Sequence, residues 1–196
     1  MFRLGLTGSI GSGKSTTAAF FREAGIPVHD ADATVHALYA GPAVALVEAA
    51  FPGTTREGKV DRAALSAVLR ASPHRFPELE AIVHPLVRAA ELAALDTAAR
   101  LGHRLVVLDI PLLFETRAEQ RCDAVLVVHV SPEEQARRVL ARPGMSEALF
   151  HAILARQMPP AEKRRRAHAM IDTGLGLDAA RRDVHALIRA LASTIG

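Results

Sequence analysis

The sequence predicts an α/β fold with a parallel sheet. Residues 105–110 and 124–130 form two almost continuous apolar runs, which are typical of strands that are covered on both faces. Helical segments separate the expected strands, and a glycine-rich turn joins the first strand to the first helix. Strands that alternate with helices in this way are connected by right-handed crossovers and lie parallel in one sheet.

The elements follow in order along the chain. Strands are expected at residues 2–6, 26–29, 105–110, 124–130 and 170–172. Helices are expected at residues 14–23, 85–101 and 132–142, after Ser146, and from Asp178 to about residue 192. Pro85 suits the first turn of its helix, and Ser146 and Asp178 suit N-caps. About 70 mostly helical residues lie between the second and third strands, too many for a simple crossover, so we expect a helical insert there.

The composition is that of an ordinary globular protein. Of the 196 residues, 49% are hydrophobic and 23% are charged, which is enough for a sizeable core. The single Cys122 excludes an internal disulfide framework and is typical of a reducing compartment. The sequence has no visible signal peptide and no apolar run of membrane-spanning length. We therefore expect a cytoplasmic protein with no membrane partner.

The stretch from Gly8 to Ser15 fits the pattern G-x-x-x-x-G-K-[ST]. Its glycines permit a tight loop whose backbone N–H groups point inward and bind anions, and the following helix adds its positive N-terminal end. Lys14 places a cation at the β- and γ-phosphates, and the Ser15 hydroxyl suits a ligand of Mg²⁺. The stretch therefore predicts a binding site for a nucleoside triphosphate.

Asp30 and Asp32 lie at the carboxyl end of the second expected strand. Ligands of open α/β sheets bind outside such strand ends. In phosphoryl transfer to a hydroxyl, a carboxylate often orients the acceptor and takes its proton, and either aspartate suits this role. One or both can instead cap the next helix.

Three further charged residues are candidates for the phosphate site. Asp109 ends a buried strand and suits either a group on the Mg²⁺ side or a turn residue. Arg138 and Arg142 are four residues apart on an expected helix and hence on one face. They can close over transferring phosphates or form an exposed helix surface.

Residues 163–166 form a basic run in a chain whose net charge is +3. Such a run suits an exposed face, a set of phosphate ligands or a nucleic-acid contact. Aromatic residues make up only 4% of the chain, which argues against stacking on single strands. We therefore expect no nucleic-acid partner.

Four stretches together resemble the dephospho-CoA kinases: LTGSIGSGKST from Leu6, VHDAD from Val28, VHPLV from Val83 and LDIPLLFE from Leu108. Their order and spacing match along most of the chain. The resemblance implies transfer of the γ-phosphoryl group of ATP to the 3′-hydroxyl of dephospho-CoA, the last step of coenzyme A synthesis. It also implies a three-layer P-loop NTPase core (about 1–32, 103–136 and 168–196), a helical acceptor-binding insert (about 33–102) and a mobile lid (about 137–167).

The resemblance also implies roles for single residues. ATP binding falls to Gly11, Ser12, Gly13, Lys14, Ser15 and Thr16. Catalysis falls to Asp32 as the base, with Lys14, Arg138 and Arg142. Acceptor binding falls to Thr7, Asp32, His84, Pro111, Leu112 and Glu115, and Mg²⁺ binding to Ser15 and Asp109. Gln157 and Lys163 fall just beyond Arg138 and Arg142.

Some positions depart from the family pattern or allow another role. Ser9 stands where the family usually has a second glycine. His168 replaces a usual acid, and Thr173 stands near an expected Asn on the adenine side. His84 precedes Pro85 and can simply cap the helix expected there.

Three other functions compete with this interpretation. Another small-molecule kinase, acting on a nucleoside or nucleotide, would use the same fold and loop. A nucleotide-dependent regulatory module would bind ATP or GTP without transfer, and the basic run could bind nucleic acid. The chain has no N-K-x-D run, which resembles the guanine-reading motif of GTPase switches. A monomer and a small homo-oligomer are both compatible with the sequence.

Overall fold

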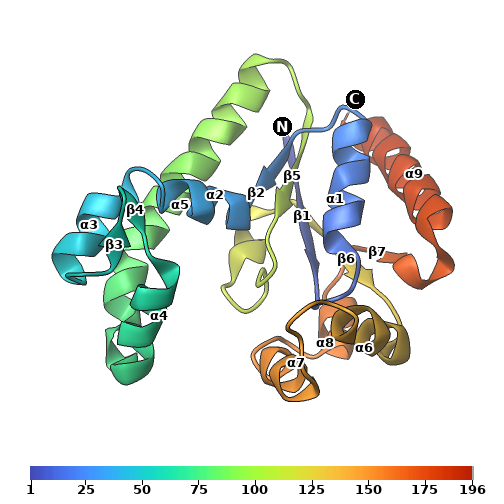
Figure 1. Cartoon of the computed structure of the whole chain (residues 1–196). Helices are drawn as coiled ribbons and strands as arrows, with labels where there is room; N and C mark the ends of the chain where they lie inside the picture. Colours follow the sequence, from blue (N-terminus) through green and yellow to red (C-terminus); the bar gives the residue numbers. More distant parts are fainter. Residues whose placement is uncertain (196) are drawn as a thin grey trace. The chain divides into compact units, whose positions relative to one another are not determined.

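The computed structural model describes residues 1–195, and its main sheet has five strands in the order β2-β5-β1-β6-β7 (Figure 1). These strands are β1 (Phe2–Gly8), β2 (Val28–Asp30), β5 (Leu105–Asp109), β6 (Ala124–His129) and β7 (Ala169–Asp172). β1 pairs in parallel with β5 and β6, and β6 pairs in parallel with β7. The expected α/β fold with a parallel sheet is confirmed.

The register of β1 determines where the glycine-rich loop begins. Leu6 is opposite both Asp109 of β5 and Leu126 of β6. Because Asp109 is the last residue of β5, the loop that follows β1 begins beside the carboxyl end of β5.

The chain divides into two compact units, which are described separately. Unit 1 comprises Met1–His29 and Ala98–Gly196, and unit 2 comprises Asp30–Thr97. Gly196, with which the expected core range ends, lies outside the described residues.

Unit 1 contains the main core. Its helices are α1 (Lys14–Glu23), α6 (Pro132–Leu140), α7 (Glu147–Leu154), α8 (Pro160–Arg165) and α9 (Leu177–Ile195), with short 3₁₀ turns at Ala118–Arg121 and Thr173–Leu175. Helices α1 and α9 lie side by side (Figure 1). Phe20 and Phe21 of α1 and Val184 of α9 pack with Leu4, Val107 and other strand residues into one buried cluster. Helices α6, α7 and α8 gather near the carboxyl end of β1 (Figure 1).

Unit 2 has a small core of its own. It contains α2 (Ala31–Leu38), α3 (Ala43–Ala50), β3 (Thr55–Arg56), β4 (Lys59–Val60), α4 (Arg62–Ala71), a 3₁₀ turn at Pro73–Arg75, and α5 (Phe76–Arg100), which continues into unit 1. Phe51, Leu65 and Leu69 are among its buried residues. Within the described chain, no single helix is long and apolar enough to cross a membrane; α2 and α3, which meet at a 70° bend, pass that test only as a pair.

Several helix boundaries predicted from the sequence were wrong. The predicted start at Pro85 was wrong, because α5 begins at Phe76 and contains Pro85 in its interior. His84 is therefore also inside a helix and caps nothing. Asp178 stands in the first turn of α9 and not at its N-cap, because α9 begins one residue earlier. Helix α6 ends at Leu140, so Arg142 lies beyond the helix on which it was expected.

The cap predicted at Ser146 was confirmed, since its Oγ accepts a hydrogen bond from the Leu149 N–H at 3.2 Å. The β3–β4 hairpin was not predicted. Its strands have only two residues each, and it turns through Glu57 and Gly58, whose φ angles are +49° and +73°. Strands this short have no readable alternation of apolar and polar residues.

Candidate active site

The glycine-rich loop has the backbone of an anion-binding loop. Gly11 and Gly13 have φ angles of +77° and +88°, in the left-handed region that glycine adopts without strain. A Cβ atom on Gly13 would also lie 2.9 Å from Cγ2 of Thr173, so the position has no room for a side chain. Gly13 is the N-cap of α1, and the helix therefore begins directly at Lys14. The loop thus ends on the positive end of a ten-residue helix.

Two glutamine side chains hold the tip of this loop. The Ile10 carbonyl accepts a hydrogen bond from Nε2 of Gln135 at 2.7 Å. The Ile10 N–H donates to Oε1 of Gln157 at 3.1 Å. Gln135 was not predicted to have a role, because nothing in the local sequence pattern shows that a helix residue bonds to a loop 125 positions away.

Lys14 forms an ion pair at the carboxyl end of β5. Its Nζ lies 2.5 Å from Oδ1 of Asp109, and the two side chains are 16% and 3% exposed. The strand register produces this proximity, because Asp109 is opposite Leu6 of β1. Asp109 is therefore part of the loop's charge environment and not merely a turn residue.

The donors near Lys14 suit a divalent cation that is bound together with phosphates. The Ser15 hydroxyl is exposed in the first turn of α1, and Asp109 supplies a carboxylate close by. Both are hard oxygen donors of the kind that Mg²⁺ prefers, and Mg²⁺ usually takes only one or two protein ligands. Across residues 1–195, no group of three or more His, Cys, Asp or Glu side chains could hold a metal ion by itself.

Arg138 is fixed by three hydrogen bonds at the start of the expected lid. Its Nε donates to Oε1 of Glu134 at 2.7 Å. Its Nη1 and Nη2 donate to Oγ1 and the carbonyl of Thr173, at 2.8 Å and 2.9 Å. Hydrogen bonds from Arg137 and Arg138 lower the pKa of Glu134 to about 2. The Glu134 carboxylate is therefore ionised at neutral pH and remains paired with both arginines.

Thr173 links Arg138 to the glycine-rich loop. While its Oγ1 accepts from Arg138, it donates to the Ser12 carbonyl at 2.7 Å, and only 8% of the residue is exposed. Thr173, one of the residues that depart from the family pattern, is thus hydrogen-bonded to both Arg138 and Ser12. His168, the other departure, is bonded as well, because its Nδ1 accepts from the Val125 N–H at 3.2 Å.

A cavity of about 350 Å³ opens beside the loop and α6. Its lining includes Gly11, Gly13, Thr16, Arg138, Arg142 and Leu177. The structure therefore brings both predicted arginines to the loop, although Arg142 lies beyond α6. The volume is within the range of small-molecule sites, which is roughly 300–1,000 Å³.

The two aspartates of the VHDAD stretch differ in their contacts. Asp30 is the N-cap of α2, and its Oδ1 accepts the Ala33 N–H at 2.9 Å. Asp32 stands in the first turn, is exposed, and makes no hydrogen bond or ion pair with any residue that the structure describes. His84, also in unit 2, is exposed on α5.

The predicted acceptor residues after β5 are partly occupied by protein contacts. Thr7 is fully buried, and its Oγ1 donates to the Pro111 carbonyl at 3.0 Å. Leu112 is 40% exposed and available for contact. Glu115 accepts the Met158 N–H at 2.6 Å and pairs with Lys163 at 2.9 Å.

Comparison with known proteins identifies the family. Residues 2–178 match the family model for dephospho-CoA kinase. This chain belongs to the dephospho-CoA kinase family. A dephospho-CoA kinase of Rhodopseudomonas palustris is 56% identical over 192 residues, which are 98% of this chain and 96% of that protein.

Solved structures share the fold. A protein of Thermus thermophilus superposes with a TM-score of 0.84 at 39% identity, over 97% of both chains. The dephospho-CoA kinase of Campylobacter jejuni superposes with a TM-score of 0.74 at 24% identity, over 98% of both chains, which is a likeness of fold. The family that the four sequence stretches resembled is thereby confirmed.

Proposed function

We propose that the protein transfers the γ-phosphoryl group of ATP to the 3′-hydroxyl of dephospho-CoA, giving CoA and ADP. The match of residues 2–178 to the dephospho-CoA kinase family carries this conclusion. The phosphate loop and the ion pair beside it are consistent with an ATP-dependent phosphotransferase.

The phosphate groups of ATP bind at the loop from Gly11 to Thr16. Backbone N–H groups of the loop and the start of α1 bind the phosphate oxygens. Lys14 exchanges its contact with Asp109 for the β- and γ-phosphates. The nucleoside occupies the cavity of about 350 Å³, where Leu177 supplies apolar surface and Arg138 and Arg142 supply positive charge.

Ser15 and Asp109 are the residues that would hold Mg²⁺. When bound, this ion neutralises charge on the β- and γ-phosphate oxygens. Arg138 and Arg142, which line the cavity, add positive charge and stabilise the negative charge that develops on the transferring group.

Asp32 is the catalytic base in this proposal. Its carboxylate accepts the proton of the acceptor's 3′-hydroxyl while the oxygen bonds to the γ-phosphorus, and the bond from that phosphorus to the bridging oxygen breaks to release ADP. Its exposed carboxylate and the separate capping role of Asp30 support the assignment. The acceptor-side residues in this proposal are His84, Pro111 and Leu112, whereas Thr7 and Glu115 shape the loop after β5.

Release of ADP from the purified protein tests the reaction. The assay contains ATP and Mg²⁺ with dephospho-CoA, adenosine, AMP or no acceptor. We expect release with dephospho-CoA alone and formation of CoA in a 1:1 ratio to ADP. Release with AMP or adenosine would identify another small-molecule kinase, and tight ATP binding without acceptor-dependent release would identify a regulatory module.

A further inference from the structure

Residues 157–166, here called the bracket segment, contact two functional loops of unit 1. The segment contains all of α8 and the whole basic run. One of its neighbours is the phosphate loop. The other is the loop after β5, residues 111–121, on the acceptor side of the proposed site.

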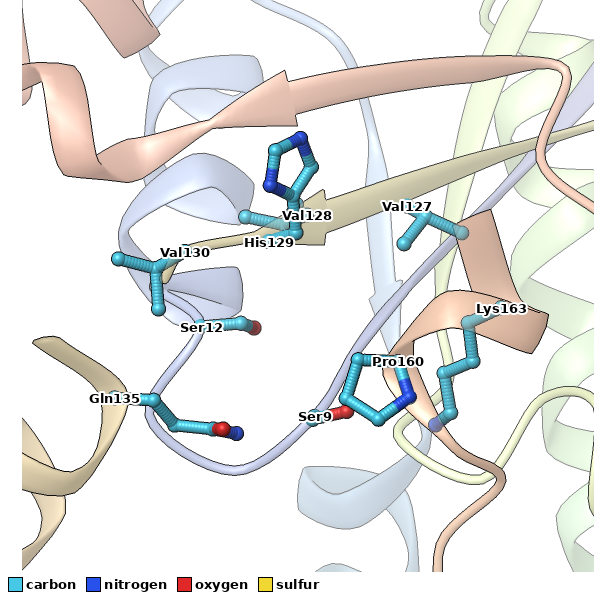
Figure 2. A pocket seen from close by; sticks show the side chains of 9 residues that line it. All are labelled: Ser9, Ser12, Val127, Val128, His129, Val130, Gln135, Pro160 and Lys163. Carbon is cyan, nitrogen blue, oxygen red and sulfur yellow. The ribbon is translucent and has the colours of Figure 1, made fainter. Parts of the chain in front are cut away.

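On the phosphate-loop side, Oε1 of Gln157 accepts the Ile10 N–H at 3.1 Å. Lys163 faces the same small cavity as this loop, because it lines a cavity of about 20 Å³ together with Ser9 and Ser12 (Figure 2). The Oγ of Ser12 is buried and has no hydrogen-bond partner among the described residues. The cavity has room for about one water molecule, which can bond to such a hydroxyl.

On the side of the loop after β5, the contacts are charged. Oε1 of Glu115 accepts the Met158 N–H at 2.6 Å and lies 2.9 Å from Nζ of Lys163. Arg166 pairs with Glu119 at 2.6 Å, and its guanidinium lies 4.5 Å from the centre of the Phe114 ring. Four residues of the two segments are therefore joined by ion pairs, and the basic run is not a uniformly solvated face.

Lys163 is the buried centre of these contacts. Its side chain is 1% exposed, whereas that of Arg165 in the same run is 77% exposed. The Lys163–Glu115 contact is an ion pair at close range, although the N–H groups of Lys163 are not aligned for a directed hydrogen bond. A buried ammonium without a partner is costly, so the position of Lys163 depends on that of Glu115.

The pKa of Glu115 also reflects its pairing with Lys163. Burial, the largest single influence, favours the neutral acid and raises the pKa of Glu115. Lys163 and the Met158 N–H together outweigh burial, and the pKa lies below its ordinary value. Glu115 is therefore ionised at neutral pH and attracts Lys163 permanently.

We propose that Lys163 is a positioning residue for phosphoryl transfer, which acts through Glu115 to hold the loop after β5 in place beside the phosphate loop. Gln157 fixes the other end of the same bracket on Ile10. Lys163 does not contact substrate in this arrangement, because its ammonium is enclosed by protein. This role deepens the proposed function and rests on it.

A double-mutant cycle tests the role of Lys163. Lys163→Met leaves Glu115 charged and unpaired, and we expect kcat/KM for dephospho-CoA to fall at least tenfold and the melting temperature to drop. Glu115→Gln combined with Lys163→Met removes both charges and keeps an acceptor for the Met158 N–H. Because this hydrogen bond still joins the loop to the bracket segment and no buried charge is left unpaired, we expect the double variant to recover most of both losses. If it folds normally but stays as inactive as Lys163→Met, Lys163 acts on substrate directly and the proposal is wrong.

The basic run supplies a matched control. Arg165→Met removes the same charge two residues away, from an exposed pair with Glu162, and we expect activity within twofold of wild type. A tenfold loss in this variant would indicate long-range charge and contradict the proposal.

If Lys163→Met does not fold, a second pair of variants tests whether the bracket segment holds the phosphate loop. Gln157→Leu should raise KM for ATP about threefold to tenfold, as expected for one lost hydrogen bond, and Gln157→Glu should restore it. An unchanged KM for ATP in Gln157→Leu would overturn the proposal that the bracket segment holds the phosphate loop. If the wild type shows no turnover, the proposed reaction is wrong. The recovery of melting temperature in the Lys163–Glu115 cycle then still decides whether this pair holds the loop after β5.

Discussion

At the scale of single residues, the structure separates side chains that the sequence could not. Asp30 and Asp32 lie at the same strand end and were equal candidates for capping and catalysis. The hydrogen bond from Ala33 gives the cap to Asp30 and leaves Asp32 exposed. Which carboxylate meets an N–H depends on the turn of α2, and a short polar stretch does not reveal that turn.

The Glu134 carboxylate leads to a prediction about pH. Its pKa falls from an ordinary 4.5 to about 2, because Arg137 and Arg138 bond to its ionised form. The contribution to stability is then complete above pH 4.5 and is lost as the pH falls from there through about 2.

Unfolding by denaturant, measured for wild type and Glu134→Gln from pH 7 to pH 3, checks this prediction. We expect a constant difference in unfolding free energy at and above pH 5 and a smaller one at pH 3. The other carboxylates are common to both proteins and cancel in the comparison. A difference that grows toward pH 3 would contradict the assignment.

At the scale of elements, Thr173 joins three parts of unit 1. It precedes α9, accepts from Arg138 of α6 and donates to Ser12 of the phosphate loop. The departure from the family pattern therefore keeps a hydrogen-bonding side chain at a junction. The sequence marked the position as unusual, but the junction depends on segments 161 residues apart.

Thr173→Val tests this junction. Valine has nearly the same shape but lacks the hydroxyl, so Arg138 and Ser12 each lose a partner. We expect stability to fall by about 1–3 kcal/mol and KM for ATP to rise, because Arg138 is less fixed beside the nucleotide cavity. Thr173→Ser keeps the hydroxyl and should behave like wild type. Equal behaviour of the two variants, in melting and in steady-state kinetics, would show that the hydroxyl has no such role.

Elements also show what the sequence can predict. The five strands of the main sheet were predicted with errors of at most two residues at their ends. β5 and β6 gave the clearest signal, because buried parallel strands form continuous apolar runs. The predicted start of α5 was wrong because it depended on a single residue, Pro85. Proline suits a first turn so well that Pro85 masked a helix that begins nine residues earlier. The glutamine contacts to Ile10 are purely tertiary and leave no local pattern.

At the scale of the whole molecule, the residues assigned to the proposed reaction are distributed over both units. The phosphate loop, Lys14 and the arginines belong to unit 1, and Asp32 belongs to unit 2. The family match spans residues of both units, so one reaction is proposed for the whole chain. We propose that Asp32 is the base of this reaction.

Parallel measurement of turnover and ATP binding in Asp32→Asn and Asp30→Asn tests this claim most directly. Asparagine caps a helix about as well as aspartate, so Asp30→Asn is a matched control. We expect both variants to bind ATP like wild type. CoA formation should fall by roughly 10²–10⁴-fold in Asp32→Asn alone, as expected for loss of a general base. CoA formation within a few-fold of wild type in Asp32→Asn, or a collapse in Asp30→Asn instead, would contradict it.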